Sequence, residues 1–243
     1  MSLEKITFFD LPSKEPCNSW SLNPWKTRLL LNYKGLDYET KWVEYPDIKP
    51  TLQPHVKPND TRWPFTIPAI KFPDGTWAQD SRVIADLIEA RHPEPSAHLD
   101  SPYQARIEAV LPRAFRPLMA IGLNQIPRRL LNPPSVEYWV RDRTAVVGGD
   151  LAEHEAKNGG TAAFAAAAPG LQEVTAMLKE NPDGPFFSGR EVSYADFVWV
   201  AALYFFKRIG EDVYEGALEA SGDRKVHEDI LKAAEPWLKR CDY

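Results

Sequence analysis

The chain has 243 residues, of which 44% are apolar and 26% charged, and its formal net charge at pH 7 is −5. This length can bury a large core without disulfide or metal staples, and the acidic balance leaves no positive excess for binding a nucleic-acid backbone. The longest apolar run, Phe197–Phe206, is about half as long as a membrane span requires. Two cysteines, Cys17 and Cys241, are too few for a disulfide framework and favour a cytoplasmic protein.

The first part of the chain alternates strand and helix patterns. Asn23 is a good N-cap, Pro24 suits a first turn and Gly35 is a good stop, so we expect a helix over residues 24–34. Residues 46–66 are proline-rich and predict a loop with at most a short helix. A second helix is expected over Asp80–Ala90. The four expected strands are Lys5–Phe9, Asp37–Tyr45, Pro68–Phe72 and Trp77–Gln79.

After Pro93 the chain has a helical pattern, because apolar residues recur at spacings of three and four. An alanine-rich stretch, Thr161–Pro169, fits either a loop or part of a helix. We therefore expect a small α/β domain with a mixed sheet over residues 1–93 and an all-helical domain over 102–243. The expected helices of the second domain are Tyr103–Leu118, Ser135–Val147, Pro169–Glu180, Tyr194–Ile209 and His227–Leu238.

Several common catalytic motifs are absent from the sequence. It has no G-x-G-x-x-G, no phosphate-binding G-x-x-x-x-G-K-[ST] and no G-x-S-x-G. Its five histidines are scattered and form no metal-ligand spacing with the two cysteines. A dinucleotide, ATP or zinc enzyme is therefore poorly supported, and we expect no metal cofactor.

Three features of the first domain point to a small-molecule site. Ser21 precedes a helix N-terminus, where anions are favoured and a hydroxyl can donate to a thiolate. Ile67-Pro68 opens a strand and predicts a cis peptide bond that leaves the Ile67 backbone free for an extended peptide. Asp80 and Ser81 begin the next helix and suit an ammonium group and a carboxylate. Together they would fit a small peptide that carries a thiol, a description that matches glutathione.

With these motifs the chain resembles the cytosolic glutathione transferases over essentially its whole length. The resemblance is carried by SLNPWKTRLLLNYKGLDYE, TIPAIKFPDGTWAQDSRVIADLI and FFSGREVSYADF. Within that family it looks most like the fungal enzymes related to bacterial β-etherases. The resemblance implies a thioredoxin-like first domain and a helical second domain that shapes the electrophile site. It also implies that Ser193 and Asp196 form a structural capping box.

The resemblance further implies an activity. Counting back thirteen residues from Lys34, as the family pattern requires, gives Ser21 as the catalytic residue, and His55 would face the glycine end of glutathione. The enzyme would bind glutathione as cosubstrate, hold its thiol as thiolate and attack a hydrophobic or aromatic electrophile, by conjugation or aryl-ether cleavage. Detoxification or secondary metabolism are the implied settings, and a homodimer is the implied assembly.

Other interpretations stay open at this point. The chain departs from the family pattern because Leu22, not proline, follows Ser21, which leaves Ser19 as a second candidate donor. Cys17 would instead suit a thiol-disulfide oxidoreductase. A non-catalytic carrier of glutathione or of hydrophobic ligands and a glutathione-dependent isomerase share the fold.

Further residues are candidates for other roles. Lys41 and Gln53 are candidates for ligand contact, and Trp25 is expected to pack between the domains. Four arginines could offset an acidic substrate, although a solvated helix face is the commoner role of such residues: Arg113, Arg116, Arg128 and Arg129.

Overall fold

The computed structural model describes residues 5–242 and has a four-stranded mixed sheet at its N-terminal end. The strand order is β2-β1-β3-β4, with β1 parallel to β2 and antiparallel to β3, and β3 antiparallel to β4. Phe8 pairs with Thr40 on one side and with Ile70 on the other. The expected mixed sheet is confirmed, and its strands are β1 (Ile6–Asp10), β2 (Tyr38–Trp42), β3 (Ala69–Lys71) and β4 (Trp77–Gln79).

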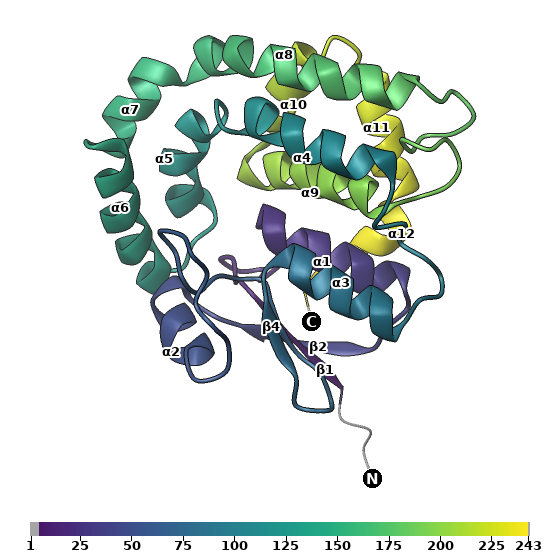
Figure 1. Cartoon of the computed structure of the whole chain (residues 1–243). Coiled ribbons are helices and arrows are strands. Elements are labelled where there is room, and N and C mark those ends of the chain that lie inside the picture. Colours follow the sequence, from purple (N-terminus) through teal and green to yellow (C-terminus); the bar gives the residue numbers. More distant parts are fainter. Residues whose placement is uncertain (1–4, 243) are drawn as a thin grey trace.

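Helices α1 (Leu22–Tyr33) and α3 (Ser81–Arg91) lie between the sheet and the helical part of the chain, as Figure 1 shows. The N-cap of α1 is Ser21 rather than the expected Asn23, so the helix begins two residues early. Strand β2 ends earlier than expected, because Tyr45–Asp47 turns into a short 3₁₀ helix with a proline in its first turn. The proline-rich loop holds one further short helix, α2 (Ile48–Leu52), in agreement with the sequence.

The rest of the chain is helical, as expected. Its helices are α4 (Pro102–Phe115), α5 (Met119–Arg129), α6 (Pro133–Val147), α7 (Leu151–Asn158), α8 (Gly160–Lys179), α9 (Tyr194–Ile209), α10 (Glu211–Ala220), α11 (Arg224–Ala233) and α12 (Glu235–Leu238).

Several helix boundaries differ from expectation. The helix expected to end at Leu118 ends at Phe115, and the one expected over residues 227–238 is interrupted at Ala234, before Pro236. The alanine-rich stretch is helical, so α8 begins at Gly160 and continues through Pro169. The sequence patterns missed α5, α7 and α10 altogether.

Small residues allow α8 to pack closely on α4. A Cβ atom added at Gly170 would lie 2.5 Å from the backbone nitrogen of Ala114, closer than atoms can approach. Ala163 and Ala167, on the same helix, are also buried. Glycine at residue 170 is therefore a requirement of the helix contact and not of the backbone conformation.

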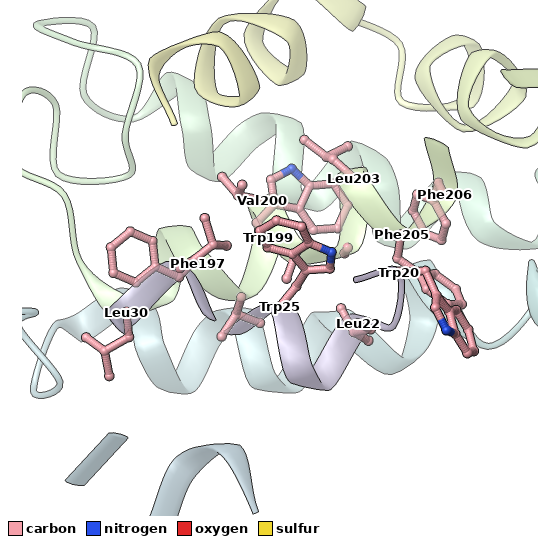
Figure 2. Close-up of a cluster of buried hydrophobic side chains, with 14 of the residues drawn as sticks. Trp20, Leu22, Trp25, Leu30, Phe197, Trp199, Val200, Leu203, Phe205 and Phe206 are labelled. Carbon is pink, nitrogen blue, oxygen red and sulfur yellow. The ribbon is translucent and has the colours of Figure 1, made fainter. Parts of the chain in front are cut away.

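The two parts of the chain share one continuous apolar core, and they meet where α1 packs against α9. Figure 2 shows side chains of α1 and of the preceding loop packed against side chains of α9. The ring centroid of Trp25 lies 4.6 Å from that of Tyr204, and Trp25 is fully buried. The expected role of Trp25 in domain packing is confirmed, and the run Phe197–Phe206 belongs to a core helix. No helix in residues 5–242 has the length and hydrophobicity needed to span a bilayer.

The start of α9 carries the expected capping box. The Ser193 side chain accepts from the helix backbone, and the Asp196 carboxylate accepts from the Ser193 backbone N–H over 2.7 Å. The other carboxylate oxygen of Asp196 accepts the Phe187 N–H over 2.8 Å. Both residues are buried, so their role is structural.

Candidate functional site

A pocket of about 420 Å³ lies where the N-terminal ends of α1 and α3 face α4 and α9. Four residues singled out from the sequence line it together, although they come from two separate segments of the chain: Ile67, Pro68, Asp80 and Ser81. The proline-rich loop closes one side through Asn59 and Thr61. The pocket is therefore built at the boundary between the sheet domain and the helical part.

The Ile67-Pro68 peptide bond is cis, as expected. Within residues 5–242 neither the N–H nor the C=O of Ile67 makes a backbone or side-chain hydrogen bond, while the Pro68 carbonyl accepts the Asp80 N–H over 3.3 Å. The Ile67 backbone thus offers one donor and one acceptor at the pocket wall. This is the pairing pattern that an extended peptide uses when it binds beside a strand.

The N-terminus of α3 forms the polar end of the pocket. Asp80 caps the helix by accepting the Arg82 N–H over 2.9 Å. Tyr194 of α9 donates its hydroxyl proton to the Ser81 carbonyl over 3.0 Å and fixes the first turn. The Ser81 hydroxyl has no partner in the described part of the chain, so it is available to a ligand carboxylate beside the helix N-terminus.

Three charged residues that the sequence patterns did not single out also line this pocket, and Arg82 of α3 is one of them. Lys26 of α1 and Glu108 of α4 both line it. Lys26 makes no ion pair or hydrogen bond with the residues that the structure describes, and burial lowers its pKa while Asp80 and Glu108 oppose that shift. The Glu108 carboxylate accepts from Gln104 over 2.6 Å. The spacing of Asn23 and Lys26 on α1, away from Trp25, was the only sequence signal for Lys26.

Ser21 lies at the N-terminal end of α1 and is half-buried. Its backbone is extended, with φ −82° and ψ 140°, so neighbouring side chains point to opposite sides. Trp20 and Leu22 both point into the core shared with α9, as Figure 2 shows. The Ser21 hydroxyl caps nothing and has no hydrogen-bond partner among residues 5–242. It is therefore free to donate to an anion at this helix end.

The two alternatives to Ser21 in the same loop have different surroundings. Ser19 is fully buried and donates its hydroxyl proton to the Asp10 carboxylate over 2.7 Å. The pKa of the Cys17 thiol is raised, chiefly by burial, which disfavours the reactive thiolate form. These surroundings favour Ser21 over Ser19 as a donor and argue against a thiol-disulfide role for Cys17.

Ser21, Ser19 and Cys17 are not among the residues that line this pocket, and neither are the remaining candidates. His55 stacks on Trp77, with ring centroids 4.1 Å apart and planes 8° from parallel. The Lys41 ammonium lies 5.7 Å above the Phe9 ring, and Gln53 is exposed.

The four arginines are also absent from the pocket wall. Two are occupied by ion pairs, Arg113 with Glu173 and Arg129 with Asp212, each at 2.7 Å. Within residues 5–242 no cluster of histidine, cysteine and acidic side chains is arranged to hold a metal ion.

Comparison with known proteins places both parts of the chain in one family. The family model described as the glutathione S-transferase C-terminal domain matches residues 103–237, and the model of the N-terminal domain matches residues 20–91. The glutathione S-transferase-like protein ustS of Aspergillus flavus is 29% identical over 261 positions, which cover 96% of this chain and 91% of the relative.

Two solved fungal structures are similar over nearly their whole length. Glutathione transferase GSTFuA3 of Phanerochaete chrysosporium is 27% identical, with a TM-score of 0.83 and coverage of 97% of this chain and 98% of the other. Glutathione S-transferase CsGST63524 of Ceriporiopsis subvermispora, solved in complex with glutathione, is 30% identical, with a TM-score of 0.81 and coverage of 96% and 98%.

Proposed function

Because the chain belongs to the glutathione S-transferase family, we propose that it is a glutathione transferase in which Ser21 holds the glutathione thiol as thiolate. The observation that carries the proposal is the unused Ser21 hydroxyl at the start of α1. The pocket with an unpaired Ile67 backbone and the α3 N-terminus lies at the same end of that helix. A tripeptide that spans these features would present its cysteine sulfur to Ser21.

The polar end of the pocket suits the free amino acid end of glutathione. Its carboxylate would lie at the Ser81 hydroxyl and the α3 N-terminus, within reach of the Lys26 ammonium. Its ammonium would lie between Asp80 and Glu108. The charged side chains that line the pocket are the cations Lys26 and Arg82 and the anions Asp80 and Glu108. Their formal charges sum to zero, which matches a zwitterionic ligand. Contact of His55 with the glycine end stays a prediction.

The chemistry follows from the pKa of the thiol. A free thiol has a pKa near 8.5, and only its thiolate is a strong nucleophile. A hydrogen bond from Ser21 and the positive end of α1 both favour the anion. The thiolate then forms a carbon–sulfur bond to the electrophile, and a leaving group such as a halide or phenolate departs with the bonding electrons. Holding both reactants together lowers the entropic part of the barrier.

The walls on the α4 and α9 side favour an apolar second substrate. Leu111 and Pro112 of α4 and Val198 of α9 line the pocket there, and apolar surfaces of this kind bind hydrophobic or aromatic molecules. Conjugation and aryl-ether cleavage are the two reactions we propose. We also propose domain limits of 1–93 and 102–243, a homodimer, a cytoplasmic location and a role in detoxification or secondary metabolism.

A turnover assay tests this function. The purified protein is retained on immobilised glutathione and then assayed with glutathione and a panel of aromatic halides, activated alkenes and β-aryl ethers. We expect enzyme-dependent loss of at least one electrophile, and formation of its glutathione adduct or release of its phenol. Tight glutathione binding with no turnover of any substrate would instead support a carrier. Failure to bind glutathione would refute the proposal.

A further inference from the structure

The loop that leads into α1 is tied to a buried ion pair. The Asp10 carboxylate, at the end of β1, lies 2.9 Å from the Arg28 guanidinium of α1, and neither side chain is exposed to solvent. Arg28 also donates to Thr40 and Tyr38 of β2. The pair therefore joins α1 to β1 and β2, the two parallel strands of the sheet.

Ser19 is the third member of this cluster and belongs to the loop itself. The carboxylate oxygen of Asp10 that contacts Arg28 also accepts the Ser19 hydroxyl proton, over 2.7 Å. The other oxygen accepts the Leu11 N–H over 2.7 Å. One carboxylate thus holds the beginning of the loop, a point near its end and the helix that follows. Ser21 lies between the last two of these attachments.

The energetics of buried charges indicate what such a cluster contributes. Removing two charges from water costs about as much free energy as their mutual attraction returns, so apolar side chains of similar volume would stabilise a core equally well. A hydrogen-bonded ion pair differs from apolar packing in fixing directions and distances between the segments that it joins. Donation from a hydroxyl to a sulfur anion depends on such distances, and a displacement of about 1 Å can lower a rate by roughly a hundredfold.

We propose that Asp10 and Ser19 are positioning residues for Ser21. They hold the start of α1 so that the Ser21 hydroxyl points at the sulfur of bound glutathione, and they act without lining the pocket themselves. The inference rests on the proposed role of Ser21 and deepens it, because it assigns the orientation of that hydroxyl to a buried network beneath it.

The decisive variant is Ser19→Ala, which removes the hydroxyl and leaves the Asp10–Arg28 ion pair in place. Ser221→Ala is its matched control, since Ser221 is equally buried, donates one hydrogen bond over 2.6 Å and lies in the helical part. The ultraviolet absorbance of the thiolate is titrated with glutathione bound to the wild type, both variants and Ser21→Ala, and kcat and KM are measured against pH.

We expect Ser19→Ala to raise the pKa of the bound thiol by about one unit and to lower kcat near neutral pH roughly tenfold. Its KM for glutathione should stay within about twofold, because the groups that bind the peptide ends are untouched. The lost activity should return as the pH is raised above the new pKa, a recovery that general structural damage would not produce. Asp10→Asn should shift the pKa in the same direction, and Ser221→Ala should match the wild type.

Two results would overturn the inference, and they are distinguishable. If Ser21→Ala shifts the titration but Ser19→Ala coincides with the wild type, positioning by Ser19 is refuted and the proposed function stands. If Ser21→Ala itself leaves the titration unchanged, the proposed role of Ser21 fails and the inference fails with it.

Discussion

The indole N–H of Trp199 donates a hydrogen bond to Nδ1 of His227 over 3.0 Å, deep in the helical core. Because Nδ1 accepts, the ring proton lies on Nε2, which donates to the Thr175 hydroxyl over 2.8 Å. That hydroxyl donates in turn to the Ser221 carbonyl over 2.9 Å. Both ring nitrogens are satisfied in the neutral form, and burial lowers the pKa of His227 to about 4.

This network predicts a loss of stability in acid. An unfolded histidine has a pKa of about 6.5, so between that pH and 4 the unfolded chain binds a proton that the folded chain does not. The contribution of His227 to the free energy of unfolding is therefore fully present above pH 6.5. It is lost as the pH decreases, and the loss reaches on the order of 3 kcal/mol at pH 4. His227→Gln stays neutral at every pH and should lack this component. Denaturant unfolding of both proteins across this range measures it, and a difference between them that does not change with pH would contradict the account.

Replacing the ammonium of Lys26 is expected to increase stability and to weaken ligand binding. Its ammonium is half-buried and makes no hydrogen bond or ion pair with the described residues, and burial lowers its pKa, which disfavours the folded, ligand-free protein. Lys26→Met should therefore raise the free energy of unfolding. The same change should weaken glutathione binding roughly tenfold or more, because a charged hydrogen bond to the ligand carboxylate is lost. Calorimetric titration with glutathione and denaturant unfolding measure the two effects.

Two comparisons make the Lys26 test specific. Lys26→Arg keeps the charge and should retain most of the affinity, whereas Lys232→Met removes an exposed lysine outside the pocket and should alter neither quantity. A Lys26→Met protein that is less stable and binds glutathione normally would show that this lysine is a packing residue only.

The core between α1 and α9 predicts a large difference between two tryptophans. Trp25 is fully buried there, and Trp25→Ala should lower the free energy of unfolding by about 3–5 kcal/mol. Trp63, near the end of the proline-rich segment 46–66, is 38% exposed and contacts Asp142 and Arg143. Trp63→Ala should cost about 1 kcal/mol or less. If thermal or denaturant unfolding shows equal losses of stability in the two variants, the core between α1 and α9 does not hold the sheet domain and the helical part together.

Local patterns predicted the elements that are strongly periodic or clearly bounded. Strand β4 and helix α9 have the expected limits, because a turn precedes the former and a capping box begins the latter. Helix α5 was not predicted because it contains Gly122 and Pro127, residue types that usually mark the end of a helix. Helices α7 and α10 are short, and short helices depend on tertiary packing more than on their own periodicity.

The site was predictable only where neighbours in the sequence define it. Asp80 and Ser81 begin a helix and Ile67 precedes a proline, so each has a local signal. Glu108 enters the pocket from α4, and its approach to Lys26 depends on how two distant helices pack. The choice between Ser19 and Ser21 likewise depends on Asp10, since only the folded chain brings that carboxylate to the Ser19 hydroxyl.

In the proposed mechanism Ser21 stabilises the glutathione thiolate, and a pH titration of bound glutathione measures that stabilisation. In the wild type the thiolate absorbance should appear about one to two pH units below that of free glutathione, a shift of the size that a hydrogen bond and a helix end produce. Ser21→Thr, which keeps a hydroxyl and a good N-cap, should retain most of the shift, and Ser21→Ala should lose it. Identical titrations of the wild type and Ser21→Ala would contradict the account.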